Sequence, residues 1–308
     1  MPRIGVVGAT GVVGRVVVEL LAERGFDDVR LFASERSAGT EIGGRVVEEA
    51  TAEALSAGNL DVCFFSVGSK ASRELVPHAV RGGALCVDKS EAFRLQDGIP
   101  LVVPEVNGAR ALEHDGIVAN PNCCSIPLSL VLKPLHDEAG VRAVRVATYQ
   151  SASGKGARRL QQLLDEPQAE HDLSADWDFD GEEFDEETKI REETRKILEL
   201  PELPVSATCV RVPVPVGHAE SVWVETDEPL DAAGAREVLS AAPSVRVADF
   251  PTPRAAAGGD EVLVGRIRRD RAGEGLSLHL ACDNLRKGAA LNGVQIAELV
   301  LSQRPVAA

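Results

Sequence analysis

IGVVGATGVVG, at Ile4–Gly14, decides the fold of this chain. Residues Arg3 to Val7 have the pattern of a buried strand, and the apolar spacing from Val12 to Arg24 predicts a helix ended by Gly25. The turn between them carries glycines with G-x-x-G-x-x-G spacing. Glycine allows a tight turn and a close approach of the backbone to a pyrophosphate, which then lies on the helix N-terminus. The stretch therefore predicts a dinucleotide-binding turn; a glycine turn that binds no ligand is the alternative.

The alternation of strand and helix continues to about residue 120. A helix is expected at Ser72–Arg81, and strands are expected at Val29–Ala33, Asp61–Ser66, Ala84–Val87, Leu101–Val103 and Ile117–Ala119. Such alternation predicts an α/β fold that begins with a Rossmann-like domain, in which helices cover both faces of a parallel sheet.

The pattern changes after Cys123. A helix at Ile126–Glu138 is followed by longer alternating strands, which are expected at Val141–Tyr149, Ser206–Val216, Ser221–Glu225, Val262–Arg268 and Leu276–Cys282. These strands predict a second, α+β domain with a largely antiparallel sheet. A last helix, Ala289–Leu301, is expected to return to the first domain. We therefore expect one domain at 1–122, completed by 285–308, and another at 123–284.

Composition excludes several classes of protein. The chain has 308 residues and a net charge of −15, which argues against nucleic-acid binding because that requires a basic face. Neither a long apolar run nor a secretory signal is evident, so we expect no membrane partner and a cytoplasmic location. The six cysteines show no C-x-x-C spacing, so we expect neither a metal site nor a disulfide framework.

The stretch Asn120–Ser125, NPNCCS, places a cysteine between an expected strand and an expected helix. Cys123 would then lie at a helix start, where unpaired N–H groups and the helix dipole favour the nucleophilic thiolate. A buried structural cysteine is the alternative. The Asn-Pro-Asn turn directly before Cys123 favours a site for covalent catalysis.

The end of the second strand indicates which nucleotide is bound. An acidic side chain there usually holds the ribose of NAD, whereas cationic and hydroxyl donors hold the 2′-phosphate of NADP. The chain has Ser34, Glu35, Arg36 and Ser37 after Ala33. Arg36 with its two flanking serines favours NADP, although Glu35 is a residue typical of an NAD site.

Several further motifs, spread along the chain, belong together. They are Gly8–Gly11 with Gly14, Ala33–Gly39, Ala92–Arg94, Val102–Asn107, Asn120–Cys123, Thr148–Gln150, Arg211–Val214 followed by Gly217-His218, and Asp283–Asn292. With these motifs the chain resembles aspartate-semialdehyde dehydrogenase along nearly its whole length. The resemblance implies NADP-dependent interconversion of L-aspartyl 4-phosphate and L-aspartate 4-semialdehyde, in the pathway to lysine, threonine and methionine. It also implies a second domain that dimerises, and a homodimer or dimer of dimers.

The resemblance further assigns roles to single residues. By similarity, Cys123 carries the acyl thioester, His218 is the acid/base, Gln150 and Asn122 contact the substrate, Arg211 binds its carboxylate, Glu186 meets its ammonium, and Arg94 with Lys189 holds inorganic phosphate. The residues similarly expected to contact NADP are Gly8, Thr10, Gly11, Val12, Val13, Gly14, Ser34, Arg36, Ser37, Ser66, Gly68, Ser153, Gly154 and Asn284.

The chain departs from the family pattern at several places, two of which bear on the expected site. Cys124 stands where the family usually has serine. The region 167–183 is short and acidic, which leaves the alignment of Glu186 and Lys189 open. The acidic stretch Asp176–Glu187 itself is expected to form a solvated loop and helix start, with Glu186 as the one exception because of its implied substrate contact.

Two other functions compete with this one. N-acetyl-glutamyl-phosphate reductase uses the same thiol chemistry on an acylated substrate, which has no free ammonium and would not need Glu186. A catalytically silent paralogue that only binds nucleotide is the other alternative. Retention of Cys123, Gln150, Arg211 and His218 together speaks against a silent protein.

Overall fold

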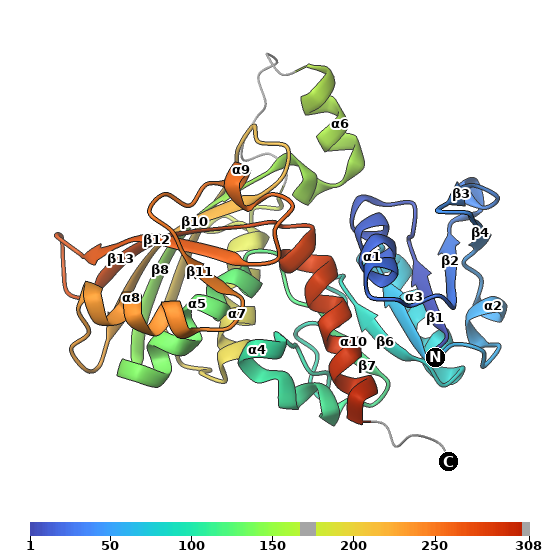
Figure 1. Cartoon of the computed structure of the whole chain (residues 1–308), viewed down its shortest axis with the longest axis horizontal. Helices are drawn as coiled ribbons and strands as arrows, with labels where there is room; N and C mark the ends of the chain where they lie inside the picture. The colour runs from blue at the N-terminus through green and yellow to red at the C-terminus, as the bar shows by residue number, and fades with distance from the viewer. Residues whose placement is uncertain (167–176, 304–308) are drawn as a thin grey trace. The chain divides into compact units, whose positions relative to one another are not determined.

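The computed structural model describes residues 1–166 and 177–303. The chain forms two compact units, which are drawn in Figure 1. Unit 1 consists of residues 1–121 together with the described residues from Ala289 onward, and unit 2 consists of Asn122–Gly288. The units therefore divide at 121/122 and 288/289, whereas the sequence predicts domain boundaries at 122/123 and 284/285. The predicted domain boundaries stay a prediction.

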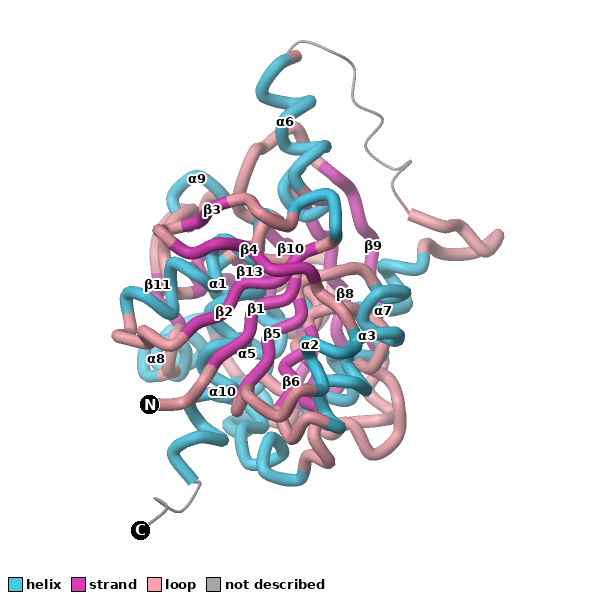
Figure 2. The backbone as a smooth tube through the Cα atoms, turned by 90° about the vertical axis from the view of Figure 1, so that its right-hand side faces the viewer, coloured by secondary structure: helices cyan, strands magenta, loops and turns pink. Residues whose placement is uncertain are grey.

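Unit 1 is built on a seven-stranded sheet of order β3-β4-β2-β1-β5-β6-β7. The strands are β1 (Ile4–Val7), β2 (Val29–Ala33), β3 (Glu41–Ile42), β4 (Arg45–Glu49), β5 (Val62–Phe65), β6 (Leu85–Asp88) and β7 (Ile117–Ala119). All neighbours are parallel except β3 and β4 at one edge. Figure 2 shows β4, β2, β1, β5 and β6 side by side. The parallel sheet expected from the alternating pattern is confirmed, with the short β3–β4 pair as an addition.

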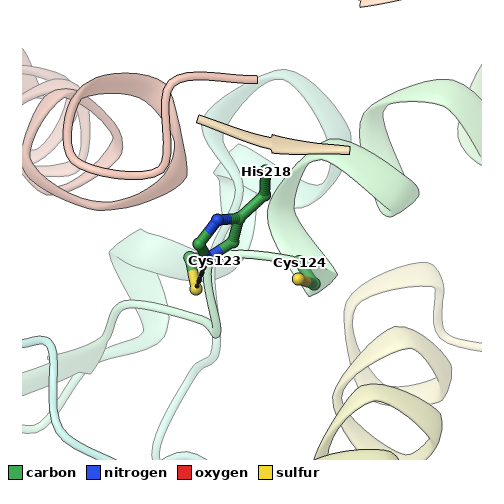
Figure 3. A group of neighbouring side chains, drawn as sticks. All are labelled: Cys123, Cys124 and His218. Atoms are coloured by element: carbon green, nitrogen blue, oxygen red, sulfur yellow. Dashed lines mark hydrogen bonds between the residues drawn. The ribbon is translucent and has the colours of Figure 1, made fainter. Parts of the chain in front are cut away.

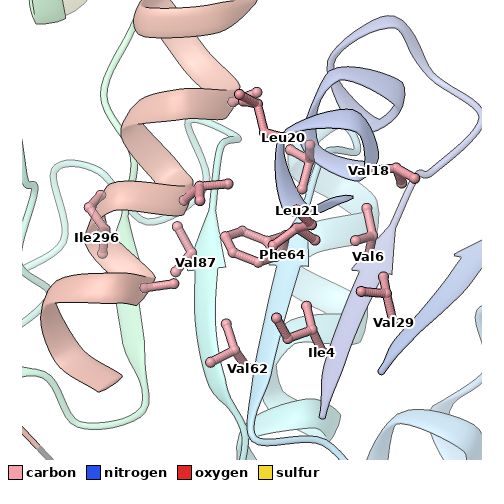
Figure 4. Packing of buried hydrophobic residues seen from close by; sticks show 14 of the residues in the cluster. Ile4, Val6, Val18, Leu20, Leu21, Val29, Val62, Phe64, Val87 and Ile296 are labelled. Carbon is pink, nitrogen blue, oxygen red and sulfur yellow. The ribbon is translucent and has the colours of Figure 1, made fainter. Parts of the chain in front are cut away.

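Helices cover both faces of this sheet. The helices of unit 1 are α1 (Val12–Glu23), α2 (Ala52–Ser56), α3 (Ser69–Arg81), α4 (Pro104–Asn107) and α10 (Leu291–Gln303), with 3-10 turns at Glu35–Ser37 and Gly108–Glu113. Helices α1 and α10 contact each other and share one apolar core with the strands, in which Ile4, Phe64, Val87 and Ile296 are buried (Figure 4). The last helix therefore packs within unit 1, as its apolar spacing predicts. It begins at Leu291 because Arg286–Ala290 forms a π-helical turn.

The prediction of a strand at Leu101–Val103 is wrong. Only Leu101 forms a bridge, to Ala119, and Val103 is the N-cap of α4. The Asn107 side chain explains the difference. Its Oδ1 accepts the N–H of Val103 at 2.9 Å and its Nδ2 donates to the carbonyl of Leu101 at 2.9 Å. The N–H of Val102 still donates to the carbonyl of Ala119 at 3.1 Å. On the side away from β7, one amide side chain takes the hydrogen bonds that a second strand would make.

Unit 2 contains a six-stranded sheet of order β11-β12-β13-β10-β8-β9. The strands are β8 (Val141–Gln150), β9 (Val205–Arg211), β10 (His218–Thr226), β11 (Val245–Val247), β12 (Val262–Arg269) and β13 (Leu276–Cys282). The pairs β8–β10, β10–β13 and β12–β13 are antiparallel, whereas β8–β9 and β11–β12 are parallel. The largely antiparallel sheet is therefore confirmed. The strand expected to reach Val216 ends at Arg211, because Pro213 and Pro215 have no N–H for a strand partner.

The helices of unit 2 are α5 (Ser125–Ala139), α6 (Ala157–Asp165), α7 (Asp185–Leu198), α8 (Ala232–Ala241) and α9 (Pro253–Ala256), with a 3-10 turn at Ala152–Lys155. Helix α5 packs against β8, β10, β12 and β13 and against α7 and α8. Helix α6 projects from this sheet (Figure 1). No helix in the described part of the chain is long and apolar enough to cross a bilayer.

The prediction that the acidic stretch Asp176–Glu187 is solvated is partly wrong. Its start, through Asp176, lies outside the described residues, and α7 begins at Asp185 as a helix start was expected near there. Glu186, the expected exception, is 6% exposed, and Glu187 is nevertheless buried as well, at 8% exposure. They face neighbours in unit 2 that the local composition does not reveal.

Candidate active site

Three neighbouring strands of unit 2 meet at one edge of the sheet. Gln150, the last residue of β8, is paired with Arg211, the last residue of β9. On the other side of β8, β10 begins at His218, and the next residue, Ala219, is paired with Tyr149. The register of the sheet therefore gathers three predicted site residues that are far apart in the sequence. All three are buried, with at most 4% exposure.

Cys123 reaches this edge from the start of α5. It lies directly before the helix N-cap, Cys124. The Asn122 side chain forms the turn, since its Oδ1 accepts the Cys124 N–H at 2.8 Å and its carbonyl accepts the Ile126 N–H at 3.1 Å. Cys123 Sγ lies 3.2 Å from Nε2 of His218 (Figure 3). A partly exposed thiol at a helix start, in contact with an imidazole, is suited to nucleophilic catalysis.

The tautomer of His218 follows from its other ring nitrogen. Nδ1 lies 3.0 Å from the backbone N–H of Ser151, which can only donate. Nδ1 must therefore accept, and the neutral ring carries its proton on Nε2. The Nε2–H then points at Cys123 Sγ, where it can stabilise a thiolate and later supply a proton to a reacting oxygen.

The ligand atoms of Cys123, Cys124 and His218 lie within 4.8 Å of one another, close enough to suggest a metal site. A metal would require the lone pair of Nε2, and a metal-binding histidine donates its other N–H to an acceptor. Here the other nitrogen faces a donor. The cluster is therefore better suited to thiol–imidazole chemistry than to metal binding.

Gln150, Asn122 and Glu186 form one hydrogen-bonded group beside Cys123. Oε1 of Glu186 accepts from Asn122 Nδ2 at 2.9 Å and from Gln150 Nε2 at 3.1 Å. Burial raises the pKa of Glu186, and the nearby Cys123 sulfur raises it further, while Asn122 and Lys189 oppose the shift. Lys189 Nζ is 2.6 Å from Asp185 and 3.9 Å from Glu186. Glu186 and Lys189, whose alignment with the family the sequence left open, therefore lie close together on α7. Glu186 also contacts two other predicted site residues, Asn122 and Gln150.

Glu193, which none of the sequence motifs indicated, is 1% exposed on the same helix, α7. Its Oε2 accepts the backbone N–H of Asn122 at 2.6 Å. This contact fixes the turn that carries Cys123. Glu186 and Glu193 are seven residues apart on one helix, and each is followed four residues later by a buried isoleucine, Ile190 or Ile197. This spacing is the signal in the sequence that could have indicated Glu193.

Arg211 is held on two sides. Its Nη1 donates to the carbonyl of Ser151 at 2.9 Å, and the ring of Trp177 lies 4.7 Å from its guanidinium carbon. Gly154 lies close by, because a Cβ on it would meet Arg211 Nη1 and His218 Nε2 at 3.1 Å each. A side chain at 154 would require Arg211 or His218 to move by a few tenths of an ångström. Trp177 is a contact that the sequence analysis did not find.

A buried carboxyl group, Glu220, lies behind the two cysteines. It is 0% exposed, and neither oxygen accepts a hydrogen bond from an N–H or O–H group in the described part of the chain; its polar neighbour is the Cys124 thiol. Burial holds the pKa of Glu220 well above its usual range, and Cys123 adds to this shift. Burial also raises the pKa of the Cys124 thiol. Cys124 is thus a poor nucleophile, whereas Cys123 is accessible.

The predicted nucleotide turn lies in unit 1, between β1 and α1. Gly8 has φ +85°, and a Cβ on it would meet the carbonyl oxygen of Ser66 at 2.5 Å. A Cβ on Gly14 would meet the carbonyl oxygen of Gly8 at 2.1 Å, and Gly11 is the N-cap of α1. These glycines let the turn close against the end of β5 and leave the first N–H groups of α1, at Val12 and Val13, without helical partners. These N–H groups are therefore suited to bind a pyrophosphate. This geometry agrees with the cofactor contacts predicted for Thr10 and its neighbours.

Arg36 lies in the 3-10 turn after β2, with Ser34 as its N-cap. It is exposed and makes no hydrogen bond or ion pair within residues 1–166 and 177–303. Its guanidinium is therefore available to a ligand. Gly68, the N-cap of α3, has open space where a Cβ would stand.

Arg94, also in unit 1, is only 8% exposed. Its Nη2 donates to the carbonyl of Lys89 at 2.6 Å and its Nε to the carbonyl of Asn120 at 3.1 Å. These bonds support the loops that follow β6 and β7. Its predicted contact with phosphate stays a prediction, and the backbone contacts give it a structural role as well.

Comparisons with known proteins agree with this arrangement. The family model described as semialdehyde dehydrogenase, NAD binding domain, matches residues 3–114, and the one described as semialdehyde dehydrogenase, dimerisation domain, matches residues 132–287. The aspartate-semialdehyde dehydrogenase of Streptomyces akiyoshiensis is 45% identical over 98% of this chain and 99% of its own, and that of Aquifex aeolicus is 42% identical over 98% of each chain. The crystal structure of aspartate semialdehyde dehydrogenase II complexed with ASA from Vibrio cholerae has a TM-score of 0.91 and 38% identity, covering 98% of this chain and 99% of that one. The Candida albicans enzyme with NADP has a TM-score of 0.79 and 26% identity, covering 98% of each chain. Both units and nearly the whole chain are matched, so this chain belongs to the aspartate-semialdehyde dehydrogenase family.

Proposed function

We propose that this protein converts L-aspartyl 4-phosphate to L-aspartate 4-semialdehyde, with NADP as its cofactor and Cys123 as its nucleophile. Family membership makes the protein a phosphorylating oxidoreductase that uses a nicotinamide dinucleotide. The observation that best supports the residue assignment is the 3.2 Å contact between Cys123 Sγ and the proton-bearing Nε2 of His218. We also propose that it acts in the cytoplasm as a homodimer or dimer of dimers.

The proposed chemistry proceeds in two displacements. The Cys123 thiolate attacks the acyl carbon of the substrate, the carbon–oxygen bond to phosphate breaks, and a thioester remains on Cys123. A reduced nicotinamide dinucleotide, which the Gly8–Gly14 turn and Arg36 would hold, would supply the hydride that reduces the thioester carbon. The resulting alkoxide expels the thiolate as the aldehyde forms. At each tetrahedral stage, the Nε2–H of His218 stabilises the negative oxygen, and a thiolate is a good leaving group.

The substrate's charges match side chains around Cys123. Arg211 suits the carboxylate because guanidinium groups bind carboxylates through two parallel hydrogen bonds. Glu186 suits the ammonium, and Gln150 and Asn122, which both bond to Glu186, would orient the chain between them. We assign the phosphate to Arg94 and Lys189.

Glu186 also favours this substrate over an N-acetylated one. Its carboxyl group is 6% exposed, and burial raises its pKa. A substrate ammonium would compensate the buried negative charge, whereas an acetylated amine carries none. The buried carboxylate therefore supports the aspartate enzyme over N-acetyl-glutamyl-phosphate reductase.

The proposal of NADP rests on Arg36. A 2′-phosphate on the adenosine ribose is a dianion that an exposed guanidinium and neighbouring serine hydroxyls can bind. The hydroxyl groups of Ser34 and Ser37 lie on the same 3-10 turn. Glu35 is the residue that would favour NAD.

A spectrophotometric assay tests the proposal. Aspartate semialdehyde, inorganic phosphate and NADP should together produce NADPH absorbance, and omission of phosphate should abolish it. N-acetyl-glutamate semialdehyde in place of aspartate semialdehyde should give far lower kcat/KM. Equal turnover of the acetylated substrate would support the reductase instead, and absence of turnover with either would support a silent paralogue. Equal kcat/KM for NAD would refute the cofactor assignment alone.

A further inference from the structure

Trp177 lies against Arg211, the residue proposed to bind the substrate carboxylate. The Arg211 guanidinium lies over the indole ring, with its central carbon 4.7 Å from the ring centroid. This distance is within the range of a cation–π contact, which is strongest for tryptophan and where water is excluded. Arg211 is 4% exposed and Trp177 is half-buried, so the contact is largely shielded from water.

The ring of Trp177 is held by neighbouring aromatic side chains. Residues 177–184, called the aromatic loop below, precede helix α7. Phe179 and Phe184 form an antiparallel bridge across this loop, and their ring centroids lie 5.3 Å apart. The ring of Phe184 also lies 6.1 Å from that of Trp177, at an interplanar angle of 53°. The loop therefore contains its own aromatic cluster, which sets the position of the indole ring.

The aromatic loop is also tied to the strand that carries Arg211. Glu187, in the first turn of α7, accepts the N–H of Phe184 through Oε2 at 2.9 Å and the N–H of Cys209 through Oε1 at 2.8 Å. Cys209 lies two residues before Arg211 in β9. One buried carboxyl group therefore links the end of the loop to β9. The adjacent residue on α7, Glu186, is the one proposed to meet the substrate ammonium.

We propose that Trp177 is a positioning residue for the substrate carboxylate, which acts through Arg211 by fixing the plane of its guanidinium. A guanidinium donates hydrogen bonds in its plane and stacks through its faces, so the indole ring does not compete with a carboxylate at the edge. Arg211 Nη1 donates to the Ser151 carbonyl at 2.9 Å, which restrains one edge, while the ring restrains one face. The inference rests on the proposed function, because it takes Arg211 as the carboxylate-binding residue.

A direct contact between Trp177 and the substrate is the alternative, and the two roles predict different kinetics. A residue that acts through Arg211 changes the KM for aspartate semialdehyde, and its effect disappears once Arg211 is removed. A residue that contacts the substrate directly keeps its effect when Arg211 is absent.

The first experiment is steady-state kinetics on the full chain, with aspartate semialdehyde, phosphate and NADP each varied in turn. Trp177→Ala should raise the KM for aspartate semialdehyde about three- to thirty-fold, the factor that corresponds to one cation–π contact. The KM for phosphate and kcat should change by less than about two-fold, because the contact is equal in the ground and transition states. Trp177→Phe keeps an aromatic face and should recover most of the lost affinity.

Two further variants make the test specific. Phe179→Ala is the matched control, because Phe179 belongs to the same loop, is 59% exposed and has its ring against Phe184. It should leave the KM for aspartate semialdehyde unchanged. The double variant of Trp177→Ala with Arg211→Ala should have the same KM as Arg211→Ala alone, since no guanidinium is left to position.

Fluorescence tests the same contact without turnover. The chain has two tryptophans, Trp177 and Trp223, so Trp223→Phe leaves Trp177 as the only indole. The probe is L-2-aminobutyrate, which has the carboxylate and ammonium of the substrate but no aldehyde. Its addition should change the emission of Trp177 in a saturable manner, and Arg211→Ala in the same background should abolish this change.

The outcomes separate this inference from the proposed function. An unchanged KM for aspartate semialdehyde in Trp177→Ala would refute the inference, as would an equal rise of this KM with and without Arg211. If Trp177→Ala does not fold, the fluorescence titration decides, and an emission change that is absent or independent of Arg211 would refute it. If the unmodified protein lacks the dehydrogenase activity but shows the Arg211-dependent emission change, the proposed function fails and the positioning role of Trp177 stands.

Discussion

The two units bury polar groups in very different numbers and for different purposes. The core of unit 1 is almost entirely apolar, and its buried charged groups are Asp88 and Arg94, which have close polar partners. Unit 2 buries many polar groups next to Cys123, namely Asn122, Gln150, Ser151, Ser153, Glu186, Glu193, Arg211, His218, Glu220 and Asn284. Unit 1 presents backbone N–H groups to a ligand from a turn on an apolar scaffold. Unit 2 instead makes its site from side chains of the core.

This difference has an energetic consequence. Burial of apolar surface stabilises a fold by roughly 25 cal/mol per Å². A buried polar group without a partner costs about 1–3 kcal/mol. Unit 2 therefore depends on the completeness of its hydrogen-bond network, and we expect substitutions there to affect activity and stability together. The following predictions test this contrast.

The largest expected effect comes from the two adjacent cysteines at the start of α5. Cys123→Ser should lower kcat by at least about a thousand-fold, because a serine hydroxyl does not ionise near neutral pH. Cys124→Ser should retain most activity, since burial raises the pKa of that thiol and keeps it protonated. Steady-state turnover of both variants is the measurement. Equal losses would mean that Cys123 is not the sole nucleophile.

A second prediction compares one arginine from each unit. Arg211→Ala should raise the KM for aspartate semialdehyde by about ten- to a hundred-fold, because this factor corresponds to the free energy of one hydrogen bond to a charged group. The KM for phosphate should rise less. Arg94→Ala should do the reverse. Because Arg94 also supports the Lys89 and Asn120 carbonyls, Arg94→Lys with a thermal melt serves as the folding control. Identical changes of both KM values in the two alanine variants would refute the division of roles.

The third prediction concerns unit 1 alone. Arg36→Ala should weaken NADP binding by about ten- to a hundred-fold and leave NAD binding nearly unchanged. Its Tm should not change, because the side chain is exposed and has no partner within the described residues. Calorimetric titration of both nucleotides measures this, with Glu35→Ala as a neighbouring control that should not weaken NADP. Similar affinity of the unmodified protein for NAD and NADP would contradict the assignment.

The smallest expected effect is on stability, and it compares one buried carboxyl group from each unit, Glu220 and Asp88. Burial raises the pKa of Glu220 above the usual 4.5, so the folded state keeps a proton that the unfolded state loses. The free energy of unfolding should therefore fall as pH rises from about 4.5 towards the folded pKa, by at most about 1.4 kcal/mol per pH unit. Glu220→Gln should remove this slope and gain stability over the unmodified protein as pH rises.

Asp88 in unit 1 is the matched comparison for Glu220. Burial also raises its pKa, but Ser72 and Ser90 donate to its oxygens at 2.7 and 2.6 Å. Asp88→Asn should lose one of these bonds and cost about 0.5–1.5 kcal/mol. Urea unfolding of both variants between pH 5 and 8 gives the comparison. The contrast between the two carboxyl groups would be wrong if Asp88→Asn were more stable than the unmodified protein. It would also be wrong if the free energy of unfolding of Glu220→Gln fell with pH as steeply as that of the unmodified protein.

Features set by near neighbours in the chain could be predicted. The glycine turn after β1, the helices α1 and α5, and the turn that presents Cys123 all follow from local spacing. The strand at Leu101–Val103 was wrong because a side chain, Asn107, made the hydrogen bonds expected of a strand neighbour. The burial of Glu187 could not be predicted because its partner, the N–H of Cys209, lies elsewhere in the chain.

The fold class, the glycine turn after β1 and the helix that begins beside Cys123 could be predicted from short segments of the chain, because they depend on periodicity, glycine conformation and turn chemistry. The set of side chains around Cys123 could not be predicted in this way, because it depends on tertiary contacts. His218 lies 95 residues from it, and the two meet through the pairing of β10 with β8 and the packing of α5 on that sheet. The proton on Nε2 of His218, the support of Asn122 by Glu193 and the isolation of Glu220 follow from these long-range contacts. Hydrogen bonds between distant residues leave no periodic signal in a sequence, since they depend on strand register and packing.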